Sequence, residues 1–306
     1  MTLPLTLIAL LSAWALGFLF HERIRKSRFL LAAAGLTALT ASYLLFVEAG
    51  ERFARVPAFR DCPDCPEMVL LPKDRFRMGS PESEPGRQGH ETLRNGLIPR
   101  SFAAGRFAVT FSEWAACVAD GGCGLYTPSD EGWGQNDRPV INVSWNDAKA
   151  YAAWLSKKTG KTYRLLSEAE REYATRAGEA TPFWWGSRIS PEEANYDGGR
   201  TYGDGEKGQN RRKTVPVKSF AANPFGLYQV HGNVWEWTGD CWSGNHDAAP
   251  SDGSAAETGD CGRRVLKGGA WNSDPAALRA ASRIGAAPDA RASSYGFRLA
   301  RVLERE

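Results

Sequence analysis

The stretch PVINVSWNDAKAYAAWLSKKTGKTYRLLSEAEREYATRAG, residues 139–178, contains the start and stop signals of two helices in succession. In the first, Ser144 and Asp147 have the spacing of a capping box, in which each side chain binds the backbone N–H of the other residue. Gly160 then supplies the residue type that most often ends a helix. The stretch therefore predicts a helix between Ser144 and Gly160.

The apolar positions of this helix share one face, as packing against a core requires. They are Ala148, Tyr151, Ala152 and Leu155. The same signals return at Ser167, Glu170 and Gly178 and predict a second helix. A third, weaker helix is predicted over residues 112–120.

The rest of the chain suits a loop-rich α+β domain. Among 306 residues there are 32 glycines and 11 tryptophans, and the formal net charge is only +3. No basic run is long enough to predict nucleic-acid binding. Short apolar runs predict strands, and residues 178–262 read mostly as loop. The predicted strands lie at 67–72, 76–80, 264–269 and 296–302.

The N-terminus has a different composition. Residues 2–20 and 29–47 each contain 19 residues without a charged side chain. At ~1.5 Å per residue, each run is long enough to cross a ~30 Å hydrocarbon layer as a helix. The segment between them, HERIRKSR, carries four basic residues and favours the cytoplasmic side. We expect a two-helix membrane anchor over residues 1–47, with a signal peptide as the alternative.

This orientation predicts an inner-membrane protein with its main domain on the periplasmic or extracellular side. A polar linker is expected over residues 48–66, followed by the domain over residues 67–306. All six cysteines lie beyond the predicted anchor, and an oxidising compartment would let neighbours in sequence pair. The expected pairs are Cys62–Cys65, Cys117–Cys123 and Cys241–Cys261. Zinc is the competing interpretation, although a single CPDC lacks a second ligand pair.

Five segments together resemble the formylglycine-generating enzyme (sulfatase-modifying factor) family. They are RFRMGS (75–80), residues 139–178, NPFGLYQVHGNVWEWTGD (223–240), RVLKGGAW (264–271) and GFRLA (296–300). They occur in the family's order and span roughly residues 66–303. The resemblance implies a compact, loop-rich domain with a C-type-lectin-like core.

In the family's oxidases, two cysteines after the glycine pair hold copper and activate oxygen. The matching positions here are Ser273 and Leu278, which cannot supply the soft thiolates that monovalent copper needs. Ala270 also replaces the family's serine after the glycine pair, whereas Trp235 still matches the pocket. Copper is therefore not expected.

Other metal chemistry has little support in the sequence. His90, His231 and His246 do not have the spacing of an iron site, and we expect all three on the surface or in loops. The resemblance does imply structural calcium, bound by mixed oxygen ligands. The firmer calcium site would use Gln229, the carbonyls of Val230, Gly232 and Val234, and Glu236. A second site would use Asn195 and the Tyr196 carbonyl, with Asp197 or Asp204 in place of an acid missing near residues 209–211.

Residues 272–295 are unusual because eight are alanine and four are serine, while Lys, Glu, Gln, Met and Trp are absent. This composition is similar to the variable segment of proteins diversified by retroelements, several of which use the same fold. The alternative is an ordinary alanine-rich surface. The positions expected to vary are Ser273, Asp274, Ala277, Ser282, Ile284, Gly285, Ala286, Ala287, Ala290, Ala292, Ser293, Ser294 and Tyr295. Trp235 and Trp271 would complete the ligand-binding face.

Three functions remain open on the sequence. The first is a membrane-anchored, non-catalytic recognition protein whose binding face is residues 271–295 and whose surface ligand is unknown. The second is a formylglycine-generating-type oxidase with an atypical site. The third is a structural or sensory subunit whose anchor packs against another membrane protein.

Overall fold

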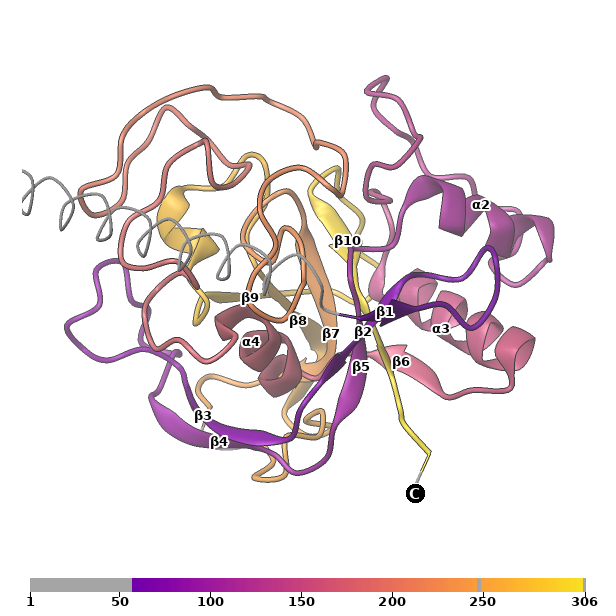
Figure 1. Ribbon diagram of the computed structural model, residues 1–306, viewed down its shortest axis with the longest axis horizontal. Coiled ribbons are helices and arrows are strands. Elements are labelled where there is room, and N and C mark those ends of the chain that lie inside the picture. Colours follow the sequence, from indigo (N-terminus) through magenta and orange to yellow (C-terminus); the bar gives the residue numbers. More distant parts are fainter. Residues whose placement is uncertain (1–56, 247–248, 305–306) are drawn as a thin grey trace, which may run out of the picture. The chain divides into compact units, whose positions relative to one another are not determined.

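The computed structural model describes residues 57–246 and 249–304 (Figure 1). The predicted membrane anchor and most of the predicted linker lie outside the described residues. None of the helices in the described part combines the length and apolar character that crossing a bilayer requires. The described part of the predicted linker contains strand β1 (Ala58–Phe59), which pairs with β2 (Met68–Leu71), so ordered structure begins before residue 67.

Two sheets and a hairpin organise the domain (Figure 1). The first sheet has the order β1–β2–β5–β11–β6, in which β5 is Phe102–Gly105, β11 is Leu299–Arg301 and β6 is Tyr163–Leu165. The second has the order β10–β7–β8–β9, in which β10 is Tyr295–Phe297, β7 is Trp235–Trp242, β8 is Asp260–Lys267 and β9 is Arg283–Ala286. The hairpin joins β3 (Asp74–Met78) and β4 (Arg94–Ile98).

The three predicted helices form, although the second ends at Ala177 and not at the predicted Gly178. α3 (Trp145–Thr159) starts at Ser144, whose capping box with Asp147 is complete, and Gly160 ends it in a left-handed conformation. α4 (Glu168–Arg176) starts at Ser167 with the same device. α2 (Phe111–Ala119) corresponds to the weaker prediction, and its capping box joins Thr110 and Glu113.

The strand predictions were less complete. Residues 296–302 were predicted as one strand, but Arg298 separates β10 from β11, which lie in different sheets. β7 was missed because it lies in the segment that reads mostly as loop. It is central in its sheet, pairing in parallel with β10 and antiparallel with β8. β7 therefore carries the NVWEW motif into the core.

Candidate functional site

Residues 271–295 do not form one solvent-facing loop. They include the short helix η1 (Pro275–Leu278) and strand β9, and they end on the first residue of β10. β9 pairs with β8, and β10 pairs with β7. Only part of the predicted binding face is therefore open to solvent, because strand pairing turns alternate side chains inward.

Burial divides the thirteen positions that were predicted to vary. Asp274 and Ala287 are exposed, whereas Ser282 and Ser294 are buried, with 6% and 9% of their surface exposed. The others are half-buried: Ser273, Ala277, Ile284, Gly285, Ala286, Ala290, Ala292, Ser293 and Tyr295. A ligand can therefore reach only part of the predicted face.

The two positions that matched the family's copper cysteines are engaged internally. The Ser273 hydroxyl accepts a hydrogen bond from the backbone N–H of Ala270 at 3.0 Å. Leu278 is completely buried in an apolar cluster that includes Phe183 and Tyr196. Its methyl groups lie so close to Gly269 that a Cβ there would meet one at 2.6 Å. Hydrocarbon therefore fills the second thiolate position.

The arginines of the segment hold its backbone in place. Arg279 is completely buried and pairs with Glu84 and Glu91, with N–O distances of 2.7 Å in both pairs. Burial opposes its charge, but the hydrogen bonds that its guanidinium donates to Glu91 and Glu84 raise the pKa of Arg279. Arg283 is also buried and pairs with Glu168 at 2.7 Å. These pairs tie η1 and β9 to distant parts of the chain.

Two tryptophans border the segment. Trp235 is 6% exposed, and its backbone N–H donates to the carbonyl of Ser294 at 2.8 Å. Trp271 is half-buried and donates its indole N–H to the carbonyl of Ser293 at 3.1 Å. Its ring also meets Trp133 edge to face, with centroids 5.2 Å apart. Trp271 and Trp133 thus provide a partly exposed aromatic edge beside the segment.

The firmer predicted calcium set does not suit a divalent cation in this arrangement. Glu236 is 1% exposed and pairs with Arg171 at 2.7 Å and with Arg298 at 2.9 Å. Burial opposes its ionisation, but the two guanidinium groups lower the pKa of Glu236. Arg171 also donates to the Val230 carbonyl at 3.0 Å. Glu236 and the Val230 carbonyl, two of the predicted calcium ligands, therefore already bind the buried guanidinium of Arg171.

The other members of that set take part in backbone and amide contacts. The Gln229 amide donates to the carbonyls of Pro216 and Ser219 and accepts from Asn233. The Gly232 carbonyl accepts from the backbone N–H of Val234 at 2.9 Å. The neutral amide of Gln229 can donate in this way, and a carboxylate could not. Gln229 therefore fastens a loop.

The second predicted calcium set fits better. Asn195 is 1% exposed, and its amide nitrogen donates to the Lys213 carbonyl and to Asn233. Its side-chain oxygen is buried without a hydrogen-bond partner. Such an oxygen is a suitable ligand for a hard cation. Within residues 57–246 and 249–304, no group of three or more His, Cys, Asp or Glu side chains is placed to hold a metal ion.

All three histidines lie in turns or bends, as predicted, but two of these loop histidines are buried. His246 is completely buried, and its ring contacts Glu168 at 3.3 Å. His231 is 2% exposed, and its Nδ1 lies 2.6 Å from the Leu278 carbonyl. Burial lowers the pKa of His231 to about 3, so this ring is neutral at physiological pH. His90 is half-buried against the ring of Trp242.

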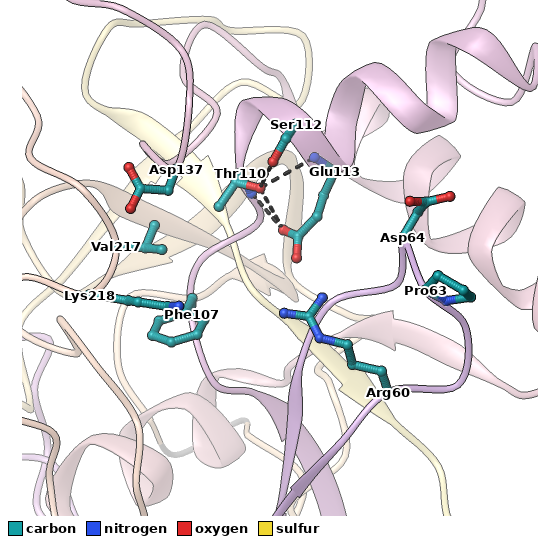
Figure 2. A pocket seen from close by; sticks show the side chains of 10 residues that line it. All are labelled: Arg60, Pro63, Asp64, Phe107, Thr110, Ser112, Glu113, Asp137, Val217 and Lys218. Atoms are coloured by element: carbon teal, nitrogen blue, oxygen red, sulfur yellow. Dashed lines mark hydrogen bonds between the residues drawn. The ribbon is translucent and has the colours of Figure 1, made fainter.

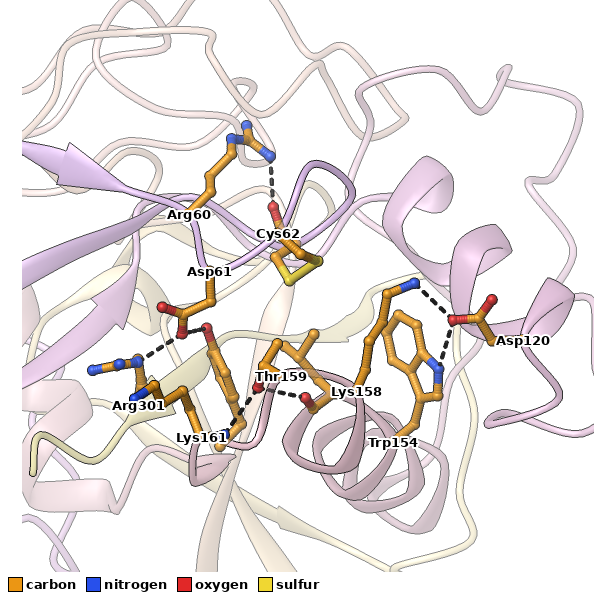
Figure 3. The surroundings of a disulfide bond; sticks show 12 residues. Arg60, Asp61, Cys62, Asp120, Trp154, Lys158, Thr159, Lys161 and Arg301 are labelled. Carbon is orange, nitrogen blue, oxygen red and sulfur yellow. Dashed lines mark hydrogen bonds and ion pairs between the residues drawn. A yellow bond between two sulfur atoms is a disulfide. The ribbon is translucent and has the colours of Figure 1, made fainter.

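All three predicted disulfides are present, as Cys62–Cys65, Cys117–Cys123 and Cys241–Cys261. Figure 3 shows the surroundings of Cys62. The neighbouring Asp61 accepts from Tyr163 at 2.6 Å and pairs with Arg301 at 2.7 Å. This carboxylate anchors the CPDC turn to β6 and β11. The cysteines therefore form disulfides, and none is left as a zinc ligand.

A cavity of about 250 Å³, which no sequence motif predicted, lies at the start of α2. Figure 2 shows its lining, which includes Arg60, Phe107, Glu113 and Lys218. The Thr110-x-x-Glu113 pattern could have predicted the helix start. Nothing local in the sequence indicates that Arg60 and Lys218 meet there, because the fold brings these distant segments together.

The chain resembles proteins of known structure and function along most of the described domain. It is 39% identical over 196 residues to the formylglycine-generating enzyme of Thermomonospora curvata, covering 58% of this chain and 61% of that protein. The chain spans between 44% and 61% of the length of the first four curated formylglycine-generating enzymes that it matches.

Two solved structures share the fold. PvdO from Pseudomonas aeruginosa is 41% identical with a TM-score of 0.69, covering 81% of this chain and 98% of that one. Treponema denticola variable protein 1 is 22% identical with a TM-score of 0.63, covering 80% and 98%. This second likeness concerns the C-type-lectin-like fold alone. Residues 54–303 match the model of the sulfatase-modifying factor enzyme 1-like domain, and the chain belongs to this family.

Proposed function

We propose that this chain is a non-catalytic recognition member of the family. The observation that carries the proposal is the filling of the two thiolate positions. Leu278 is completely buried in hydrocarbon, and Ser273 caps the backbone of Ala270. A hydroxyl and an alkyl group cannot replace two soft thiolates for monovalent copper. The position that would bind a redox metal instead contributes to packing.

The binding face is made by the accessible part of residues 271–295. Its outer side chains include Asp274 and Ala287, with the Trp271 ring at the border. Buried Arg279 and Arg283 keep the backbone beneath them in one conformation. Small side chains on a rigid support can be exchanged with little effect on fold stability. This arrangement supports a diversified face, although its buried members Ser282 and Ser294 belong to the support.

Membrane attachment is part of the proposal. The apolar runs at residues 2–20 and 29–47 would anchor the chain, with the basic segment between them on the cytoplasmic side. The recognition domain would then face the periplasm or the exterior. Three disulfides agree with an oxidising compartment. A single calcium ion would bind at the Asn195 oxygen and the Tyr196 carbonyl, and it would order the adjoining loop.

The copper assay tests the central claim. The full-length protein is loaded with monovalent copper, dialysed and supplied with oxygen and a cysteine-containing peptide. The Thermomonospora curvata enzyme serves as the positive control. We expect no stoichiometric copper and no aldehyde product by mass spectrometry. Conversion of the peptide by the wild-type protein would refute the proposal and favour an oxidase with an atypical site.

Diversification is tested separately by sequencing codons 271–295 in many isolates. We expect substitutions at exposed and half-exposed positions, while the codons for Arg279 and Arg283 stay constant. An identical segment in all isolates would reject diversification, but it would not support the alternative of an oxidase.

A further inference from the structure

The cavity at the start of α2 is separate from the proposed binding face. None of its lining residues belongs to the segment 271–295. Its walls come from the CPDC turn, the start of α2 and the loop around residues 217–218 (Figure 2). At about 250 Å³ it lies just below the ~300–1,000 Å³ typical of ligand pockets. Its occupant would therefore be a small molecule.

Charges of both signs line this cavity. Lys218 has no carboxylate partner among the described residues, and its ammonium lies 5.9 Å from the centre of the Phe107 ring. Asp64 and Asp137, in the same lining, likewise form no ion pair within the described part. Arg60 differs, because it already donates to the Cys65 carbonyl at 2.6 Å. Lys218 is thus the cation available to an anionic group.

Glu113 supplies the opposite charge. One of its carboxyl oxygens, Oε2, accepts from the Thr110 backbone N–H at 2.8 Å and lies 3.0 Å from the Thr110 hydroxyl. The capping box uses only this oxygen, and Figure 2 shows the carboxyl group directed toward the middle of the lining. Burial raises the pKa of Glu113. An approaching ammonium group would stabilise its ionised form.

We propose that this cavity binds a free amino acid as its zwitterion. The ligand carboxylate lies at Lys218, the ligand ammonium lies at Glu113, and an apolar side chain contacts Phe107 and Val217. A peptide terminus does not satisfy the cavity, because it carries only one of the two charges. This small-molecule site is independent of the proposed recognition of a surface ligand by residues 271–295.

Calorimetric titrations of the full-length protein with three probes test the ligand carboxylate and the ligand ammonium separately. L-leucine carries both charges, N-acetyl-L-leucine lacks the ammonium, and L-leucinamide lacks the carboxylate. We expect saturable leucine binding below about 10 mM, where ligands of ~1 mM affinity saturate. Each analogue should bind at least about tenfold more weakly, since a charged hydrogen bond contributes ~1.5–3 kcal/mol and each ~1.4 kcal/mol is a factor of ten.

Two variants assign the charges to residues. Lys218→Gln should weaken leucine about tenfold and leave leucinamide unchanged. Glu113→Gln should weaken leucine and leave N-acetyl-leucine unchanged, and glutamine can keep the capping box closed. Lys213→Gln, at an exposed lysine outside the lining, is the matched control. Absence of leucine binding, or equal binding of all three probes, would overturn the proposal. Neither result bears on the copper assay.

Discussion

Arg171 offers the sharpest test of how the core is held together. Its guanidinium is buried and donates to Glu236 at 2.7 Å, to the Val230 carbonyl at 3.0 Å and to the Thr175 hydroxyl. Replacing it with methionine keeps a long apolar side chain but removes every donor. We expect Arg171→Met to destabilise the fold while the protein still folds.

The magnitude follows from the partners that remain. Removing one member of a buried ion pair costs about 3–5 kcal/mol, because the other charge is left uncompensated. Arg298 stays at 2.9 Å from Glu236 and keeps that carboxylate paired. The loss should therefore lie at the lower end, about 3 kcal/mol. For a domain of this size, this corresponds to a fall in Tm of about 6–12 °C.

Urea and thermal unfolding of the full-length protein, followed by circular dichroism, measure the change. Arg75→Met is the control, since Arg75 is exposed and its side chain forms no ion pair within the described residues. Its effect should stay within about 0.5 kcal/mol. A loss below about 1 kcal/mol in Arg171→Met would refute the reasoning, because the pair would then contribute no more than a surface contact.

Three further outcomes are expected. Leu278→Ala should lower the unfolding free energy by about 2–5 kcal/mol, as cavity formation in a core does, and an unchanged urea midpoint would contradict its burial. The pKa of His231 is near 3 in the folded protein and ordinarily 6.5, so the unfolded chain binds the extra proton and stability falls as pH drops below 6.5. At pH 5 the loss of unfolding free energy due to His231 should be about 2 kcal/mol. His231→Gln should therefore show a weaker dependence of the unfolding free energy on pH below 6.5. Equal slopes in the wild-type protein and the variant would reject this role of His231. Equilibrium dialysis should find one calcium per chain, unchanged in Glu236→Gln, whereas loss of calcium in that variant would place the ion at Glu236 instead of Asn195.

The helices and disulfides could be predicted because their determinants are local. The capping boxes at Ser144 and Ser167 join residues three positions apart. Cys117 and Cys123 are separated by 6 positions. Interactions over such distances depend little on the rest of the fold, so residue types and spacing suffice to indicate them. The absence of thiols at Ser273 and Leu278 likewise follows directly from the residue types in the sequence.

Burial and partner choice could not be predicted in this way. Arg279 is fully buried because the fold brings it to Glu91, which is 188 positions away. Arg171 and Glu236 meet across 65 positions, and this contact changes the interpretation of the firmer calcium set. An arginine in an alanine-rich segment looks like a surface residue until a carboxylate is placed beside it. Local pattern determined the helices and the disulfides, whereas tertiary structure alone decided which charges are buried, because desolvation depends on the whole surrounding fold.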